Sequence, residues 1–262
     1  MFSKLPPENI CIVRLSHIGD TCHALAVIRT IQDTWPETNL TWIIGKTEAS
    51  LMADIPGIEF IIFDKSKGRL AYRELHKTLA NRRFDVALCM HASMRVNRIC
   101  RIIDTPVRLG FDKARARDFQ WLFTNQRIEA TDSQHVLDGM LSFARHIGVP
   151  ERPLRWDIPL SAKNLDFAAR HLTRDQPILA ISPCSTQRSR NFRNWSVENY
   201  SAAANHARNR FGCSVVLTGG PSKLESAYGR RIADICGPDA VSYTHLTLPT
   251  NREVLISVVA VS

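Results

Sequence analysis

Residues 10–31, ICIVRLSHIGDTCHALAVIRTI, constrain the fold more than any other stretch. The apolar run from Ile10 to Leu15 predicts a strand buried on both faces of a parallel sheet. A tight loop follows, and apolar residues at helical spacing then predict a helix, namely Ala24, Val27, Ile28 and Ile31. In an open α/β sheet the loop after a strand lies in the ligand crevice, where a helix start favours anions. A carboxylate at that helix start, Asp20, therefore needs an explanation, and an N-cap and a catalytic group both fit it.

The rest of the chain continues the alternation of strands and helices. We expect strands at 40–44, 59–63, 84–89, 107–111, 178–182 and 214–218, and helices at 70–82, 94–103, 135–146, 165–172, 197–210 and 224–235. This order predicts an α/β fold with mostly parallel sheets and right-handed crossovers. The segment 148–159 contains three prolines and has no helical period, as a linker would. We therefore expect a first domain at 1–155 and a second at 156–240.

The totals exclude several classes of protein. No apolar run approaches the roughly 18 to 20 residues of a membrane span, and the first ten residues lack the apolar core of a signal peptide, so we expect a cytoplasmic protein. The seven scattered cysteines include no Cys-x-x-Cys pair, which favours reduced thiols over disulfides or a metal site. The net charge of +9 indicates an anionic partner. Nucleic acid is disfavoured, because the basic residues lack zinc-finger spacing and an RNA-binding signature.

A second informative stretch spans residues 181–195. It follows a buried strand and contains the hydroxyls of Ser185 and Thr186. Three arginines come next, Arg188, Arg190 and Arg193, and a helix then begins that we expect Ser196 to cap. We expect Trp195, beside this cap, in the core. Hydroxyls, guanidinium groups and a helix start are the parts of a diphosphate site, although a solvated basic loop fits the same residues.

Three motifs together indicate a family. SHIGD before an apolar helix, then CSTQRSRNFRNWSVENY, then VVLTGGPSKLE resemble the family 9 glycosyltransferases, the bacterial lipopolysaccharide heptosyltransferases, in order over residues 10–240. The resemblance implies the GT-B architecture, in which two Rossmann-like domains bind the acceptor at 1–155 and the nucleotide sugar at 156–240. It implies an inverting glycosyltransferase that needs no metal or other cofactor. The expected reaction moves a heptose from ADP-heptose to the inner core of lipopolysaccharide, either Kdo-lipid A or a first heptose.

The same resemblance assigns roles to single residues. Asp20 matches the general base of the family. The donor diphosphate and nucleotide are expected at Ser185, Thr186, Arg193, Gly219 and Gly220. The acceptor, a lipid-linked phosphorylated sugar, is expected at Ser16, His17, Gly19, Arg95, Lys113, Arg115 and Arg117, although a plain surface cluster of charge fits the last four as well. His135 matches a family histidine, and a helix-packing role fits it too.

The chain also departs from the family. Its members contain a later Asp-Thr-Gly-x-x-His loop that grips the donor, and no such sequence follows here. Residues 241–262 instead resemble a translated sequencing-library adapter, so we expect a non-native tail and an incomplete second domain. The alternative function is therefore an inactive fragment that binds nucleotide or anionic sugar weakly. The expected partners are ADP-heptose, the lipid-linked acceptor and the cytoplasmic face of the inner membrane, where the protein is peripheral, with no nucleic acid.

Overall fold

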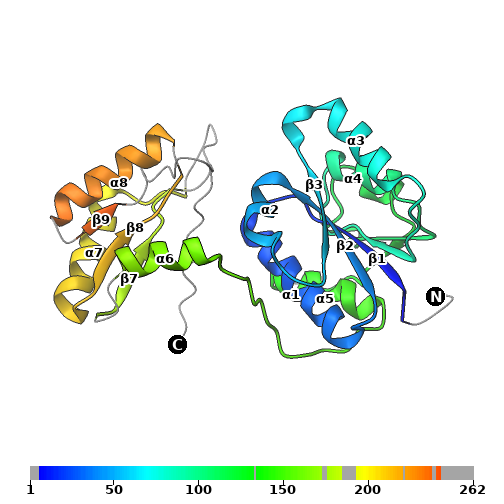
Figure 1. Cartoon of the computed structure of the whole chain (residues 1–262), viewed down its shortest axis with the longest axis horizontal. Helices are drawn as coiled ribbons and strands as arrows, with labels where there is room; N and C mark the ends of the chain where they lie inside the picture. Colours follow the sequence, from blue (N-terminus) through cyan, green and yellow to red (C-terminus); the bar gives the residue numbers. More distant parts are fainter. Residues whose placement is uncertain are drawn as a thin grey trace. The chain divides into compact units, whose positions relative to one another are not determined.

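The computed structural model describes residues 6–132, 134–172, 176–184, 193–220, 222–237 and 240–242. The chain divides into two compact units, Met1–Pro159 and Leu160–Ser262. Each unit has its own parallel sheet and its own helices, which agrees with the α/β order expected from the sequence (Figure 1).

The first unit is built on a six-stranded sheet in the order β3-β2-β1-β4-β5-β6. All neighbouring strands pair in parallel, and the strands are β1 (Asn9–Val13), β2 (Asn39–Gly45), β3 (Glu59–Phe63), β4 (Val86–Leu88), β5 (Val107–Gly110) and β6 (Gln126–Arg127). The strand order reverses at β1, where Ile10 pairs with Leu40 of β2 on one side and with Val86 of β4 on the other. In doubly wound sheets, ligands bind outside the carboxyl ends of the two strands at this reversal. A site is therefore expected after β1 and β4.

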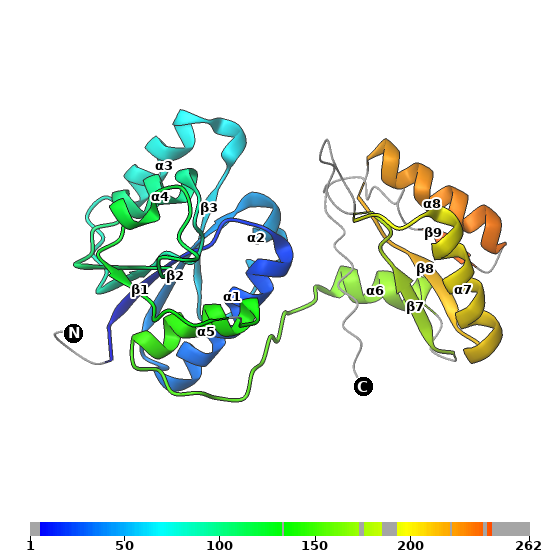
Figure 2. The same ribbon diagram turned by 180° about the vertical axis from the view of Figure 1, so that it is seen from behind.

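Helices cover both faces of this sheet, which explains why the central strands β1 and β4 are buried over almost their whole length. The helices are α1 (Ile18–Thr34), α2 (Lys46–Met52), α3 (Arg69–Leu79), α4 (Met94–Ile102) and α5 (Val136–His146), with short 3-10 turns at η1 (Lys65–Lys67) and η2 (Gln120–Leu122). Ile10 and Ile12 belong to the core under α1 and α5, whereas Cys11 and Val13 belong to the core under α3 and α4. Figure 2 shows the two helix pairs on opposite sides of the sheet. Alternate residues of β1 thus fill two separate cores.

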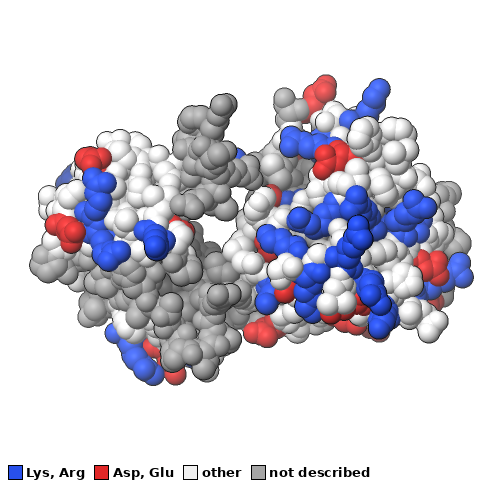
Figure 3. All heavy atoms as spheres, turned by 90° about the horizontal axis from the view of Figure 1, so that it is seen from above, with Lys and Arg blue, Asp and Glu red and all other residues white. Residues whose placement is uncertain are grey.

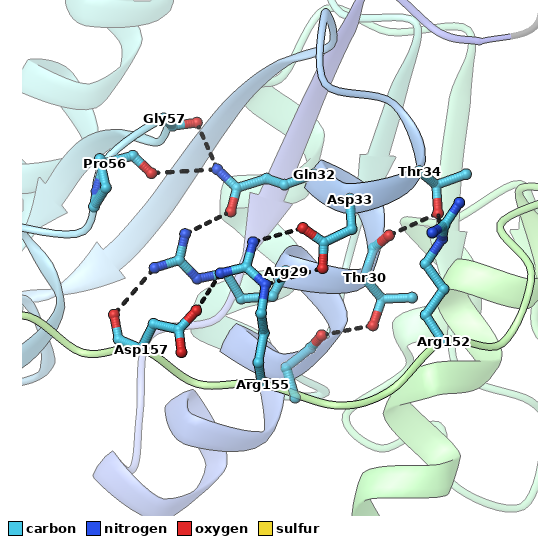
Figure 4. A network of polar contacts seen from close by, with 11 residues as sticks. Arg29, Thr30, Gln32, Asp33, Thr34, Pro56, Gly57, Arg152, Arg155 and Asp157 are labelled. Atoms are coloured by element: carbon cyan, nitrogen blue, oxygen red, sulfur yellow. Dashed lines mark hydrogen bonds and ion pairs between the residues drawn. The ribbon is translucent and has the colours of Figure 1, made fainter.

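The segment after α5 is fixed to α1 rather than free. The guanidinium of Arg155 donates to both carboxylate oxygens of Asp33 at 2.9 and 2.6 Å, and Arg29 donates to the carbonyl of Asp157 at 3.1 Å (Figure 4). The indole N–H of Trp156 donates to the carbonyl of Cys22 at 3.0 Å. The division between the units falls after residue 159 instead of 155, because these contacts attach the expected linker to the first unit.

The second unit has a three-stranded parallel sheet in the order β7-β8-β9. Its elements are α6 (Ala162–His171), β7 (Ile178–Ile181), α7 (Val197–Phe211), β8 (Ser214–Leu217), α8 (Lys223–Cys236) and β9 (Ala240–Ser242). The expectation that the α/β pattern stops at residue 240 is wrong by one strand, because Ala240 pairs with Val215 and extends the sheet. Residues 243–262 lie outside the described residues, so the expectation of a non-native tail stays a prediction.

Candidate functional site

Asp20 lies where the strand order reverses, in the first turn of α1 directly after β1. Its side chain is 34% exposed and forms an ion pair with Arg14. The N-cap interpretation is wrong, because His17 occupies the N-cap and Asp20 is the third residue of the helix. Its Oδ2 still accepts a long hydrogen bond from the backbone N–H of His17, at 3.5 Å. The carboxylate is thus held at both the helix start and the guanidinium while remaining open to solvent.

Arg14 is a charged residue directly after β1, the strand at which the strand order reverses. It is buried, and its Nη1 donates to the carbonyl of Met90, directly after β4, at 2.7 Å. Burial lowers the pKa of Arg14, while the charges of Asp20 and Glu48 act in the opposite direction. Its Nε meets no acceptor among the residues that the structure describes. A buried guanidinium beside a carboxylate stays charged, so Arg14 couples Asp20 to the end of β4.

Two further titratable groups face this pair. Glu48 lies in the first turn of α2, after β2, and burial raises the pKa of its carboxyl group. His91 follows β4, and its Nδ1 has no partner within the described part of the chain. Burial, followed by the positive charge of Arg14, lowers the pKa of His91 to about 4, so its imidazole is neutral at pH 7. Three neighbouring strand ends therefore bring two carboxylates, a guanidinium and a neutral imidazole together.

The shape of this edge also depends on a glycine. A Cβ atom on Gly45, the last residue of β2, would lie 2.2 Å from the carbonyl oxygen of Leu15 and 2.4 Å from Oε2 of Glu48. No side chain fits at this distance, so only glycine lets β2, the loop after β1 and Glu48 approach so closely.

Stability should depend on pH through His91. Its pKa in the folded chain, about 4, lies below the ordinary 6.5. Between these two pH values, the unfolded chain therefore binds a proton that the folded chain does not bind. The stability that comes from keeping His91 neutral is fully present above pH 6.5 and is lost as the pH falls toward 4. Between pH 7 and pH 5 we expect a loss of about 1 to 2 kcal/mol, discounted for partial exposure. The free energy of unfolding in urea should not fall between pH 7 and pH 5 by this amount in His91→Asn. It should still fall in the control His76→Asn, which replaces an exposed histidine. Equal pH dependence in both variants would contradict the prediction.

The structure separates the expected acceptor residues into two groups. Ser16, His17 and Gly19 lie in the loop and helix start that hold Asp20, and Nδ1 of the exposed His17 lies 3.8 Å from Oδ2 of Asp20. Arg95 is exposed in the first turn of α4, after the strand that ends near His91. These four residues and Asp20 come from the two strand ends at the reversal.

The basic loop after β5 is the second group. Arg115 forms an ion pair with the buried carboxylate of Asp112 and donates to the carbonyl of Glu129 at 3.3 Å. Lys113 and Arg117 are exposed and form no ion pair with any described residue. The loop thus offers two cations to a ligand, while Arg115 holds the loop together.

The donor residues belong to the second unit. Ser185 and Thr186 lie outside the described residues, as do Arg188 and Arg190. Arg193 is exposed shortly before α7, where the hydroxyl of Ser196 accepts from the N–H of Asn199 at 3.1 Å, which confirms the expected cap. Trp195 is 52% exposed, so the prediction of a core residue is wrong; it packs edge-on against Tyr200 at the helix start instead.

Gly219 and Gly220 follow β8, and here a close backbone approach is present. The N–H of Gly220 donates to Oε1 of Glu225 at 3.1 Å, and a Cβ atom on Gly220 would lie 2.9 Å from Oε2. The N–H of Glu225 in turn donates to the hydroxyl of Ser222, at 3.2 Å, so the start of α8 is closed by its own carboxylate. A phosphate group at this helix start has to compete with Glu225.

Three further expectations concern the whole chain. All seven cysteines lie in the described part, where they are free thiols. No His, Cys, Asp and Glu cluster within the described ranges could hold a metal ion. None of the helices that the structure describes is long and apolar enough to cross a membrane.

A doubly wound parallel sheet followed by a second parallel α/β unit agrees with the two Rossmann-like domains of the expected GT-B architecture. The family model of glycosyltransferase family 9 (heptosyltransferase) matches residues 72–260. The chain therefore belongs to glycosyltransferase family 9, as its motifs predict.

Known proteins support the same assignment. The chain is 38% identical over 230 residues to the lipopolysaccharide core heptosyltransferase OpsX of Haemophilus influenzae, a match that covers 88% of this chain and 65% of that protein. The chain thus spans less than two thirds of the length of this relative.

Solved structures show the fold. The Escherichia coli heptosyltransferase WaaC with ADP has a TM-score of 0.71 at 17% identity, covering 92% of this chain and 75% of that one. A family 9 glycosyltransferase from Veillonella parvula has a TM-score of 0.73 at 18% identity, covering 90% and 69%. These similarities confirm the expected α/β fold of the GT-B kind.

Proposed function

We propose that the protein is a lipopolysaccharide heptosyltransferase that moves a heptose from ADP-heptose to the inner core, with Asp20 as the general base. Family 9 membership supports the transferase, the relative named for the lipopolysaccharide core supports the acceptor, and the relative solved with ADP supports the donor. The single observation on which the proposal depends is the pair of Asp20 and Arg14 at the strand reversal of the first unit.

The chemistry needs one proton acceptor. A hydroxyl oxygen of the acceptor sugar attacks the anomeric carbon of the heptose, the bond from that carbon to the diphosphate breaks, and ADP leaves. Asp20 takes the hydroxyl proton as the new bond forms, and Arg14 fixes the orientation of its carboxylate. Attack from the face opposite the diphosphate inverts the anomeric centre. Holding the hydroxyl and the sugar together supplies a large share of the rate.

The acceptor is proposed at the first unit. Ser16, His17 and Gly19 adjoin the base, and the exposed guanidinium of Arg95 lies after the neighbouring strand. Phosphate groups on a lipid-linked sugar suit guanidinium and ammonium donors, because charge-assisted hydrogen bonds are the strong ones.

The donor is proposed at the second unit. Arg193, Ser185 and Thr186 are the hydroxyl and guanidinium groups that neutralise the departing diphosphate, and Gly219 and Gly220 admit the nucleotide near the end of β8. Neutralising developing charge with fixed donors is how such a transfer proceeds without a metal ion.

Glycosyl transfer by the protein tests the proposal. With ADP-heptose and either Kdo-lipid A or its heptosylated form, we expect a product heavier by one heptose, with an inverted anomeric centre and an unchanged yield in EDTA. Nucleoside diphosphate sugars with other bases serve as controls. Transfer from one of those donors and none from ADP-heptose would overturn the proposal; ADP binding without any transfer would favour the weak nucleotide binder.

We also propose that the protein acts in the cytoplasm, at the inner face of the membrane that contains the acceptor lipid. Lys and Arg side chains gather on one face of the first unit (Figure 3). The net charge of +9 favours an anionic lipid surface.

A further inference from the structure

The turn after the basic loop exposes three large apolar side chains close together. Phe119, Trp121 and Leu122 have exposed fractions of 61%, 51% and 62%, and we call these three the apolar tip. They lie within four consecutive residues at η2, whereas single exposed apolar residues are common on any protein surface. A contiguous exposed group of this kind marks an interaction surface.

The apolar tip stands on a rigid base. The side chain of Gln120, between two tip residues, is fully buried; its Nε2 donates to the carbonyl of Cys89 at 2.9 Å, and its Oε1 accepts from the N–H of Phe111 at 3.1 Å. The residue before the tip, Asp118, accepts from the side chain of Asn97 at 2.7 Å through its carbonyl. These contacts fix the turn, so the tip is exposed by construction of the fold rather than by local fraying.

The backbone at the tip is strained. Asp118 and Phe119 both have left-handed backbone angles, with φ of 52° and 56°. Such angles are unfavourable for residues other than glycine, most of all for a bulky aromatic residue. The turn therefore keeps an unfavourable backbone conformation while the side chain of Phe119 stays exposed.

The charges around the tip are arranged for an anionic surface. Both acidic side chains of the loop are engaged by the protein, because Asp112 pairs with Arg115 and Asp118 accepts from the backbone N–H of Met94 at the start of α4. Lys113 and Arg117 are exposed without an ion pair to any residue that the structure describes. An aromatic and aliphatic tip beside free cations complements a bilayer surface, where rings sit at the headgroup level and cations attract anionic lipids.

The tip also belongs to the candidate-site edge of the sheet. Gln120 holds the carbonyl of Cys89, and the next residue, Met90, provides the carbonyl that Arg14 binds. The turn follows β5, the strand beside β4, so its base and the pair of Arg14 and Asp20 share one backbone segment. A lipid surface bound at the tip lies at the edge where a lipid-linked acceptor enters.

We propose that the apolar tip inserts into the headgroup region of a bilayer containing anionic phospholipids, with Lys113 and Arg117 binding the headgroups. The inference deepens the proposed function, because it names the surface from which the acceptor is taken. It requires no catalysis, so vesicles without acceptor or nucleotide sugar test it separately.

Flotation of the protein with vesicles tests the proposal. Wild type should bind phosphatidylglycerol vesicles and bind phosphatidylcholine vesicles weakly. Replacing the tip by Phe119→Ser, Trp121→Ser and Leu122→Ser should lower the partition coefficient about 100-fold. Replacing both cations by Lys113→Gln and Arg117→Gln should lower it about 30-fold on phosphatidylglycerol.

Controls separate the tip from general stickiness and from misfolding. Ile62→Ser with Leu70→Ser removes two side chains of similar exposure, 54% and 50%, elsewhere on the same unit and should leave binding unchanged. Asp20→Asn should bind vesicles like wild type. The tip variant should keep its thermal unfolding midpoint and its turnover of a short soluble acceptor.

Three outcomes would overturn the proposal. If the tip variant binds vesicles as strongly as wild type, the tip has no part in membrane binding. The same conclusion follows if the Ile62 and Leu70 control loses as much vesicle binding as the tip variant. A wild-type dimer that the tip variant converts to a monomer, seen by sedimentation without lipid, would assign the surface to a second copy of the chain.

Discussion

Replacing Asp20 with asparagine is expected to lower kcat for heptose transfer by about a thousandfold, within the range that a general base contributes. The amide keeps the size of the side chain and can still accept from the N–H of His17, so the start of α1 stays intact. It cannot take the proton of the acceptor hydroxyl. KM for ADP-heptose and the affinity for ADP should change little, because the donor is proposed at the other unit.

The matched control is Asp33→Asn. Asp33 lies on the same helix, is 32% exposed and pairs with Arg155 as Asp20 pairs with Arg14. Replacing Asp33 should leave kcat within about twofold of wild type. It should weaken the attachment to α1 of the segment that contains Arg155, which Figure 4 shows. Steady-state kinetics at saturating donor decide the matter: an Asp20→Asn enzyme that retains a tenth of wild-type kcat would remove Asp20 from proton transfer.

Replacing Arg14 with methionine is the second large expected effect. Methionine fills the volume of the arginine stem, but the carbonyl of Met90 loses its donor and the carboxylate of Asp20 loses its partner. We expect kcat to fall at least about 100-fold, because the base is no longer oriented, and stability to fall by about 2 kcal/mol. The stability loss is smaller than for a fully buried pair, since water can reach the partly exposed Asp20.

Arg29→Met separates the two effects. Arg29 is as buried as Arg14, is charged, and has an Nε without a partner among the described residues, but it binds Gln32 and the carbonyl of Asp157. The Arg29→Met variant should lose about as much stability as Arg14→Met and keep the wild-type kcat. If urea unfolding and kinetics give both variants the same loss of kcat, Arg14 acts through the fold alone.

Periodicity predicted the regular elements well where they are long or fully apolar. The strand at 59–63 begins and ends at the residues expected, because β-branched and aromatic residues fill it between turn signals. The helix at Lys46–Met52 was missed, since it follows β2 without an intervening turn and is too short to show a helical period. β9 was missed because only three residues form it.

The candidate site was predicted only in part. Asp20 was found because a carboxylate stood in a loop between an apolar strand and an apolar helix. Arg14 was assigned only to the strand at 10–15 and not to the site. A charged residue inside an otherwise apolar run was the signal that could have identified it. Glu48 and His91 meet Arg14 through strand pairing, which a single sequence does not reveal.

Long-range contacts explain the remaining differences. Three prolines correctly predicted a segment without helix or strand at 149–159. Its attachment to α1 through Arg155 and Trp156 was not predicted, because it joins residues more than 100 positions apart. The pairing of Arg115 with Asp112 could not be read from the sequence, so the role of Arg115 toward the acceptor stays a prediction, and the apolar tip became visible only through exposure.

A double-mutant cycle on kcat tests most directly the claim that Asp20 and Arg14 work as one base. The variant with both Asp20→Asn and Arg14→Met should be no slower than Asp20→Asn alone, because Arg14 acts on turnover only by orienting the carboxylate. Independent losses that multiply, giving at least about a further 100-fold reduction, would contradict a shared role and show that Arg14 affects turnover by another route than orienting Asp20.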